Sequence, residues 1–169
     1  MELANFIKDV PNYPKPGIIF KDITPLLGDK EAFIFAINSF AENFKDKIDV
    51  VVGIDARGFL LAAPVAYKLG VGLAIVRKPG KLPRKTIRED YTLEYASNSL
   101  EIHTDAILPG QNVLIIDDVL ATGGTMEATC KLVRKLGGNV AGIGFLMELE
   151  FLKGREKLEG FEVFSLIQY

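Results

Sequence analysis

The sequence VLIIDDVLATGGT, residues 113–125, sets the expected architecture of the chain around it. The apolar residues 113–116 are typical of a strand that is buried on both faces. Two acids follow, and after a short step come two threonines that flank a pair of glycines. We therefore expect a strand, then a polar turn, and then a helix over residues 124–136 that ends at the next pair of glycines.

The turn has the residue types of a phosphate site. Glycines allow a positive φ and let the main chain approach a ligand closely. Main-chain N–H groups at the start of a helix then point at an anion, and threonine hydroxyls add further donors. We predict that this turn binds a phosphate group through Ala121, Thr122, Gly123, Gly124 and Thr125.

The two acids before the turn are suited to a different part of the ligand. Ionised carboxylates only accept hydrogen bonds, so Asp117 and Asp118 fit sugar hydroxyls better than a phosphate. Donors for phosphate beside acceptors for a sugar indicate a ribose-phosphate site. The alternative is a strand end with two solvated acids and an ordinary glycine-containing helix start. Neither G-x-x-x-x-G-K-[ST] nor G-x-G-x-x-G occurs in the sequence.

Outward from this segment, short β-branched runs alternate with helical patterns. This alternation predicts an α/β fold with a mostly parallel central sheet flanked by helices, in a single domain over residues 1–169. Ligands of such sheets bind at the carboxyl ends of the strands. The expected strands are residues 49–54, 72–77, 113–116, 140–147 and 161–167, and the other expected helices are residues 30–44 and 58–69.

Other segments are expected to be irregular. Residues 11–28 are rich in Pro and Gly and should form an irregular arm, and residues 78–91 have many charges and no clear period, so they should form a loop. Residues 92–96 and 100–104 could pair as a hairpin across 97–99. Pro64 should kink the helix around it or mark a new start.

Composition limits the classes of function. A net charge of −2 argues against a general binder of nucleic acids or membrane surfaces. The longest nearly apolar stretch, residues 58–67, is too short to cross a bilayer, and the first ten residues do not have the pattern of a secretory signal. A single cysteine, Cys130, fits a reducing cytoplasm. The single histidine, His103, has no Cys partner at ligand spacing, so we predict no metal site of His and Cys ligands.

The segment VLIIDDVLATGGT resembles the phosphoribosyl diphosphate motif of the type I phosphoribosyltransferases. Within that family the chain is most similar to the members that use adenine, and the similar segments extend from near the first residue to the last. They are YPKPGIIFKDITPLL, GIDARGFLLAAP, VRKPGKLP, YTLEYASNSLEIH, LKGREKL and FSLIQY. The resemblance implies a type I phosphoribosyltransferase-like fold with an N-terminal arm or hood, residues 1–30, and a mobile lid loop, residues 78–91.

The resemblance also implies roles for charged residues. Arg57 matches a turn that contacts the diphosphate, and arginine suits that bidentate contact. Arg77, Lys78 and Lys81 match phosphate-contacting positions of the lid, although Pro79 stands where family members often have a further base. The alternative for Arg57 is a surface arginine or a salt bridge to Asp55, and the alternative for the lid bases is a set of solvated surface charges.

Glu94 lies in the Leu-Glu-Tyr segment just after the lid. The resemblance implies that it lies near the reacting purine nitrogen, where it would act as a general base or acid. The alternative is an exposed acid on an edge strand.

The arm carries the expected base site. The resemblance implies that the main chain at Ile19 and Lys21 reads the edge of adenine, while apolar side chains such as Phe20 cover its face. Lys21 stands where many relatives have arginine, and a role carried by the main chain should tolerate this change. The alternative is an arm that only packs on the sheet.

Together these features predict a purine-salvage transferase that converts adenine and 5-phosphoribosyl 1-diphosphate to AMP and diphosphate. Mg²⁺ is expected as the cofactor, bound mainly through the diphosphate substrate, with Asp117 or Asp118 nearby. The apolar helix at residues 58–69 suggests a homodimer. Two alternatives remain open: a phosphoribosyltransferase for xanthine or hypoxanthine, and a non-catalytic regulator that senses phosphoribosyl diphosphate.

Overall fold

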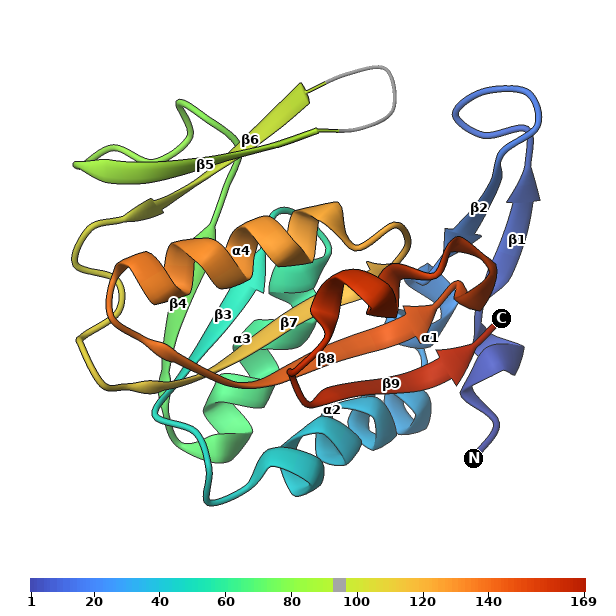
Figure 1. The fold of residues 1–169 in the computed structure, drawn as a ribbon. Coiled ribbons are helices and arrows are strands. Elements are labelled where there is room, and N and C mark those ends of the chain that lie inside the picture. The colour runs from blue at the N-terminus through green and yellow to red at the C-terminus, as the bar shows by residue number, and fades with distance from the viewer. Residues whose placement is uncertain (93–96) are drawn as a thin grey trace.

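A computed structural model describes residues 1–92 and 97–169. A five-stranded sheet in the order β4-β3-β7-β8-β9 runs through its centre (Figure 1), and every neighbouring pair is parallel. This arrangement confirms the predicted α/β fold. The strands are β3 (Val50–Ile54), β4 (Gly72–Val76), β7 (Asn112–Leu120), β8 (Asn139–Glu148) and β9 (Val163–Gln168).

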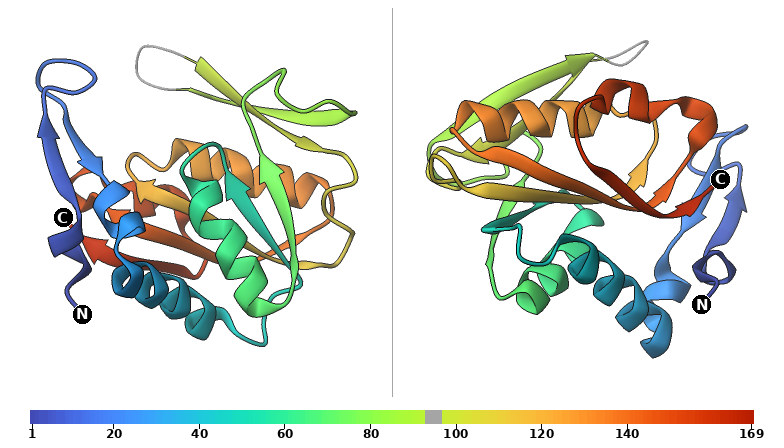
Figure 2. Two further views of the ribbon diagram at one scale, coloured as in Figure 1. Left: turned by 180° about the vertical axis from the view of Figure 1, so that it is seen from behind. Right: turned by 60° about the horizontal axis from the view of Figure 1, so that its bottom comes forward.

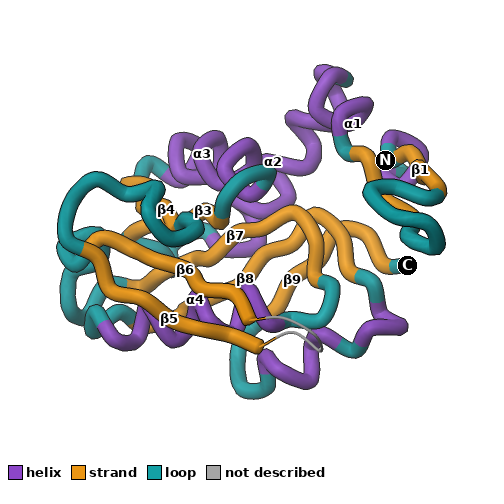
Figure 3. The backbone as a smooth tube through the Cα atoms, turned by 90° about the horizontal axis from the view of Figure 1, so that it is seen from above, coloured by secondary structure: helices purple, strands orange, loops and turns teal. Residues whose placement is uncertain are grey.

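Helices cover both faces of this sheet. Helix α2 (Lys30–Phe44) and helix α3 (Gly58–Leu69) lie on one face, and α4 (Gly124–Lys135) lies on the other (Figures 2 and 3). Each face buries its own cluster of apolar side chains, so the sheet is hydrophobic on both sides, as the unbroken apolar run of β3 requires. All three helices were predicted from hydrophobic periodicity, and their bounds agree closely with the prediction.

Packing between α2 and β8 depends on a residue without a side chain. A Cβ atom on Gly142 would lie 2.3 Å from a ring atom of Phe44, so only glycine lets the aromatic face of α2 approach the sheet this closely. Phe40 and Phe44 are both fully buried. The periodic apolar residues of α2 therefore form the core beneath the sheet.

The prediction of a new helix start at Pro64 is wrong, whereas its alternative, a kink at this residue, stays a prediction. Helix α3 is one continuous helix with Pro64 inside it, and it ends at Gly70, which has a φ of 70°. The helix buries one side against the sheet, whereas Leu60 and Tyr67 are 49% and 90% exposed. Tertiary packing along the buried side maintains the helix where proline removes one main-chain donor.

Strand β7 is longer than the four residues that were predicted. It continues through both acids to Leu120, because Asp117, Val119 and Leu120 pair with residues of β8. The acids therefore belong to the strand itself rather than to the turn after it. As successive residues of a strand, the two acids point to opposite faces of the sheet.

The predicted loop at residues 78–91 and the predicted hairpin pairing are both partly wrong. Residues 86–92 form β5 (Thr86–Thr92), which pairs with β6 (Ser97–His103) in an antiparallel hairpin above α4 (Figure 1). Along β5, partly buried residues alternate with exposed ones, and the partly buried Glu89 forms an ion pair with Lys135 of α4. Because this inward position is charged, a hydrophobicity pattern does not detect the strand.

The N-terminal arm is also more ordered than predicted. It contains β1 (Lys8–Pro11), paired with β2 (Ile19–Asp22), and the short helix α1 (Thr24–Gly28). The β1–β2 ribbon stands beside the end of the chain, near the carboxyl ends of β8 and β9 (Figure 1). Short 3-10 helices lie at Leu3–Phe6, Glu150–Leu152 and Gly154–Leu158.

None of the helices in the described residues is long and apolar enough to cross a membrane.

Candidate active site

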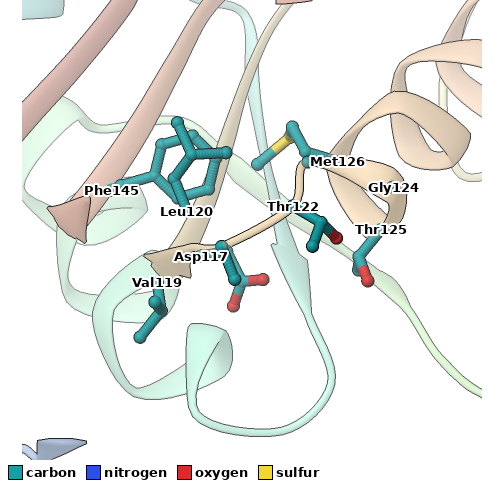
Figure 4. A pocket seen from close by; sticks show the side chains of 10 residues that line it. Asp117, Val119, Leu120, Thr122, Gly124, Thr125, Met126 and Phe145 are labelled. Carbon is teal, nitrogen blue, oxygen red and sulfur yellow. The ribbon is translucent and has the colours of Figure 1, made fainter. Parts of the chain in front are cut away.

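The turn between β7 and α4 forms a small cavity of about 70 Å³, here called the cradle. Figure 4 shows the carboxylate of Asp117 and the hydroxyls of Thr122 and Thr125 on one side and the side chains of Leu120, Met126 and Phe145 on the other, with Val119 beside Asp117. Gly123, the residue before α4, has a φ of 88°, a conformation that glycine adopts without strain. The cradle is lined by Asp117, Val119, Leu120, Ala121, Thr122, Gly123, Gly124, Thr125, Met126 and Phe145.

The back of the cradle is held by the segment after β8. A Cβ atom on Gly123 would lie 2.7 Å from the carbonyl oxygen of Gly154, and one on Gly154 would lie 2.5 Å from the carbonyl oxygen of Ala121. Next to this contact, Arg155 donates from Nε to both carboxylate oxygens of the buried Glu148, at 2.8 and 2.9 Å. The cradle therefore has a rigid support from a distant part of the sequence.

Of the two neighbouring acids, Asp117 lies in surroundings that disfavour its ionisation. The main-chain N–H of Asp118 donates to Oδ1 of Asp117 at 2.9 Å. Desolvation by the surrounding protein, together with the charge of Asp118, raises the pKa of Asp117 well above its ordinary value of 3.8. A ligand that donates hydrogen bonds to Asp117, or a cation close to it, would stabilise its ionised form.

Arg57 links the acid pair to the arm. Its Nε lies 2.6 Å from Oδ2 of Asp118, and its Nη1 donates to the carbonyl oxygen of Lys21 at 3.0 Å. The guanidinium also lies over the ring of Phe20, 4.6 Å from the ring centre. Among the described residues, the buried Oδ2 of Asp118 receives no well-aligned hydrogen bond, so Arg57 acts on it as a neighbouring charge.

The predicted lid bases lie in different surroundings. Nε of Arg77 donates to Asp55 at 3.1 Å, and the main chain of Arg77 pairs with that of Glu101 in β6. Lys78 is exposed and lines the cavity described below, and Lys81 is exposed without being among its lining residues. Of the three, Lys78 is the one that the structure brings to the acids.

A larger open cavity of about 410 Å³ joins these parts. Carboxylates, cations and hydroxyls converge on it from the segments after β3 and β4, from β5 and β7, and from the start of α4, so one ligand could contact several elements at once. Its lining residues are Asp55, Ala56, Arg57, Lys78, Tyr91, Asn98, Leu100, Asp117, Asp118 and Thr125. A sugar in this cavity would face the acids while its phosphate lay toward Thr125.

The arm residues do not line this cavity, but they contact one of its residues. The guanidinium of Arg57 lies over the ring of Phe20, whereas the side chain of Lys21 pairs with Asp9 at 2.7 Å and lies over the ring of Tyr169. Ile19, which is 58% exposed, and Lys21 line a separate cavity of about 500 Å³. Glu94 falls outside the described residues.

Comparisons with known proteins identify the family. A family profile described as "Phosphoribosyl transferase domain" matches residues 27–163. A relative from Halothermothrix orenii, named adenine phosphoribosyltransferase, is 56% identical over 169 residues and covers 99% of each chain. The chain belongs to the adenine phosphoribosyltransferase family. Another adenine phosphoribosyltransferase, from Desulfitobacterium hafniense, is also 56% identical, over all of this chain and 98% of that one.

Solved adenine phosphoribosyltransferases have the same fold. The structure from Thermoanaerobacter pseudethanolicus superposes with a TM-score of 0.96 at 53% identity, covering 99% of this chain and 98% of that one. The Saccharomyces cerevisiae enzyme, solved with adenine and an imino-altritol bisphosphate, gives a TM-score of 0.91 at 43% identity, covering 97% and 96%. The family resemblance inferred from the separate motifs is confirmed.

Two residues that line the larger cavity were not predicted as site residues from the sequence. Asp55 pairs with Arg77 at the edge of the larger cavity, and Tyr91 of β5 contacts Thr125 of the cradle, with the two hydroxyl oxygens 3.3 Å apart. The position of Asp55 directly after a buried strand was a usable signal. Nothing in the local pattern around Tyr91 indicated that the hairpin would fold over α4.

Proposed function

We propose that this chain transfers the 5-phosphoribosyl group of 5-phosphoribosyl 1-diphosphate to adenine, which gives AMP and diphosphate. The observation that carries this function is the meeting of three parts in one place. The cradle, the acid pair and the arm strand β2 are joined through Arg57, which contacts both Asp118 and Lys21. Membership of the adenine phosphoribosyltransferase family supports the same reaction, with a role in purine salvage.

In this reaction adenine N9 forms a bond to C1′ as the bond from C1′ to the diphosphate oxygen breaks. The electron pair of the broken bond leaves with the diphosphate, and the N9 proton passes to a base, for which we propose Glu94. Positive charge develops on the ribose in such a loose displacement, so positioning and electrostatic stabilisation dominate. Asp117 and Asp118 would hold the ribose hydroxyls while residues 121–125 hold the 5′-phosphate.

The diphosphate requires positive charge. We propose that Arg57, Arg77, Lys78 and Lys81 supply it when residues 78–91 act as a lid, which would also keep water from C1′. Arg77 is at present paired with Asp55, so diphosphate binding would compete for this arginine. Arg57 would have to contact the diphosphate from its position between Asp118 and Lys21.

Mg²⁺ fits the donor set at this site as a substrate-bound ion. No three Asp, Glu, His or Cys side chains gather as a metal site in residues 1–92 and 97–169, so protein ligands alone are too few for it. The buried Oδ2 of Asp118 still lacks a well-aligned donor, and Asp117 has a raised pKa, so a nearby cation would stabilise both carboxylates. When bound, Mg²⁺ would neutralise the diphosphate.

We further propose that residues 1–30 act as a hood over adenine. The main chain at Ile19 and Lys21 would read the edge of the base, and Phe20 would cover its face. The position of Phe20 under Arg57 supports this, because it places an aromatic ring beside the arginine that contacts Asp118. The oxopurine alternative and the regulator alternative are not favoured, since the relatives of highest identity described above are named for adenine.

A homodimer is proposed through α3. The helix presents Leu60 and Tyr67 outward, and Leu73 of the neighbouring strand β4 is 44% exposed. A second copy of the chain would cover these apolar side chains. A cytoplasmic location stays a prediction from the sequence.

The reaction is tested by incubating the chain with 5-phosphoribosyl 1-diphosphate, Mg²⁺ and one purine base at a time while diphosphate release is measured. We expect release with adenine and much slower release with hypoxanthine, xanthine or guanine. Absence of release with adenine would contradict the proposal, and release with an oxopurine alone would favour the first alternative. Tight binding of 5-phosphoribosyl 1-diphosphate without release with any base would favour the regulator.

A further inference from the structure

A residue of the β5–β6 hairpin contacts two residues of the phosphate cradle. The hydroxyl of Thr125 donates to the phenol oxygen of Tyr91 over 3.3 Å. The Tyr91 ring lies over the first residue of α4, because a Cβ atom on Gly124 would be 3.3 Å from ring atom Cδ2. Gly124 therefore leaves room for an aromatic ring beside the N–H groups that begin α4.

The position of Tyr91 is fixed from several sides. Its ring packs against the buried apolar cluster between the sheet and α4, and across the hairpin it is paired with Asn98. Two residues earlier on the same side of β5, Glu89 forms its ion pair with Lys135 near the other end of α4. The phenol oxygen is thus held at the cradle by a strand that is itself attached to the cradle helix.

Tyr91 also faces the larger cavity, where the proposed ligand would bind. Tyr91 lines the larger cavity together with Asp117, Asp118 and Thr125. In the bond with Thr125 the phenol oxygen acts as acceptor, so its own O–H proton is available to a second group. A phosphate oxygen is an acceptor and would take that proton, and the hydroxyl of Thr125 could turn toward the same phosphate.

We propose that Tyr91 is a further binding residue for the ribose 5-phosphate, donating its phenolic O–H to a phosphate oxygen held by residues 121–125. The inference rests on the proposed function, because it requires the cradle to hold that phosphate. It adds a contact from the hairpin to a site otherwise built from β7 and α4. Filling of the cradle by phosphate then also holds the hairpin in place over the ribose.

Tyr91 could instead be only a packing residue, and Tyr91→Phe separates the two roles. The variant keeps the ring that covers Gly124 and removes the O–H. The matched control is Tyr67→Phe, which removes the same group from a residue of α3 that lines neither cavity and keeps the aromatic ring of the proposed subunit interface. Isothermal titration measures the binding of two probes to each protein, ribose 5-phosphate and inorganic diphosphate, and a thermal melt checks folding.

We expect Tyr91→Phe to weaken ribose 5-phosphate binding by about tenfold, as for loss of a hydrogen bond to a charged group. Diphosphate binding should stay within twofold of the unchanged chain, and Tyr67→Phe should match the unchanged chain with both probes. The KM for 5-phosphoribosyl 1-diphosphate should rise in parallel in Tyr91→Phe while the KM for adenine stays constant.

Ribose 5-phosphate binding within twofold of the unchanged chain would overturn the inference, and so would equal weakening of both probes, which would indicate a displaced hairpin. In either case AMP formation by the unchanged chain leaves the proposed function standing. If the unchanged chain binds no ribose 5-phosphate and forms no AMP, the proposed function fails and the inference fails with it.

Discussion

Nη1 of Arg57 donates a hydrogen bond of 3.0 Å to the carbonyl oxygen of Lys21, 36 residues earlier in the chain. The same guanidinium lies 2.6 Å from Asp118 through its Nε. One side chain thus connects the strand proposed to read the base with an acid proposed to hold the ribose. Its planar fork holds donors in fixed, separate directions toward the two partners, whereas a lysine ammonium is a compact charge without this fixed geometry.

Arg57→Lys should therefore show which effects depend on the positive charge of residue 57 and which depend on the shape of the guanidinium. It keeps a cation near Asp118 but loses the link to Lys21, so we expect the KM for adenine to rise up to about tenfold with a smaller loss of stability. Arg57→Ala should also lower the free energy of unfolding by about 1–3 kcal/mol, because the buried carboxylate of Asp118 loses its neighbouring charge. Steady-state kinetics and urea unfolding measure the two effects.

The double variant Arg57→Ala with Asp118→Asn is the control, since it removes both charges and should recover part of the lost stability. An unchanged KM for adenine in Arg57→Lys would show that the contact with Lys21 has no part in base binding.

Asp117→Asn should make the ligand-free chain more stable at neutral pH. The pKa of Asp117 is raised in the folded state, so ionisation opposes folding: the penalty is absent below the ordinary value of 3.8 and full above the folded-state pKa. The amide removes this penalty and keeps an acceptor for the N–H of Asp118. We expect a rise of about 2–4 °C in Tm near pH 7 for each kcal/mol gained.

The rise should shrink as the pH falls toward 3.8, and thermal melts over a pH series measure it. The same variant, combined with Asp118→Asn, should lose most of the transferase activity. A Tm difference that does not vary with pH would contradict the role given to ionisation.

Gly123→Ala should disable the cradle. Alanine at a φ of 88° is strained, and its Cβ atom would lie 2.7 Å from the carbonyl oxygen of Gly154. Gly110→Ala is a matched control, because Gly110 has a φ of 86° and open space around its Cβ position. Both variants should lose about 1 kcal/mol from the strained backbone, and Gly123→Ala about 1–3 kcal/mol more from the clash.

Binding of ribose 5-phosphate should be lost in Gly123→Ala and kept in Gly110→Ala, as measured by titration alongside urea unfolding. Equal destabilisation of the two variants would mean that the main chain at Gly154 shifts easily to make room for the Cβ atom and does not support the cradle.

Tyr67→Asp should shift the chain from dimer to monomer, because it places a charge in the apolar face proposed as the subunit interface. Sedimentation velocity measures the change. Phe35→Asp is the control, since Phe35 is 41% exposed on α2, away from that face. Dissociation by both variants, or by neither, would argue against an interface at α3.

Buried elements were the most predictable part of this fold. Unbroken apolar runs specified β3, and helical periodicity specified α2, because these patterns reflect burial directly. Strand β5 was missed, since its inward Glu89 is satisfied by Lys135, which is 46 residues away in the chain. The end of β7 was missed because its last residues are held by pairing with β8, which a local pattern does not contain.

The sequence by itself determined that a glycine-containing turn and two acids follow a buried strand, since strand, glycines and acids are adjacent in the chain, and it predicted phosphate binding there. It also predicted Arg57 and the arm as parts of the site through family motifs. Only the tertiary structure decided that Arg57 bridges Asp118 and Lys21, that Gly154 supports Gly123 and that Tyr91 contacts Thr125 of the cradle. These contacts join residues far apart in the chain, and their geometry depends on packing between elements rather than on local propensity.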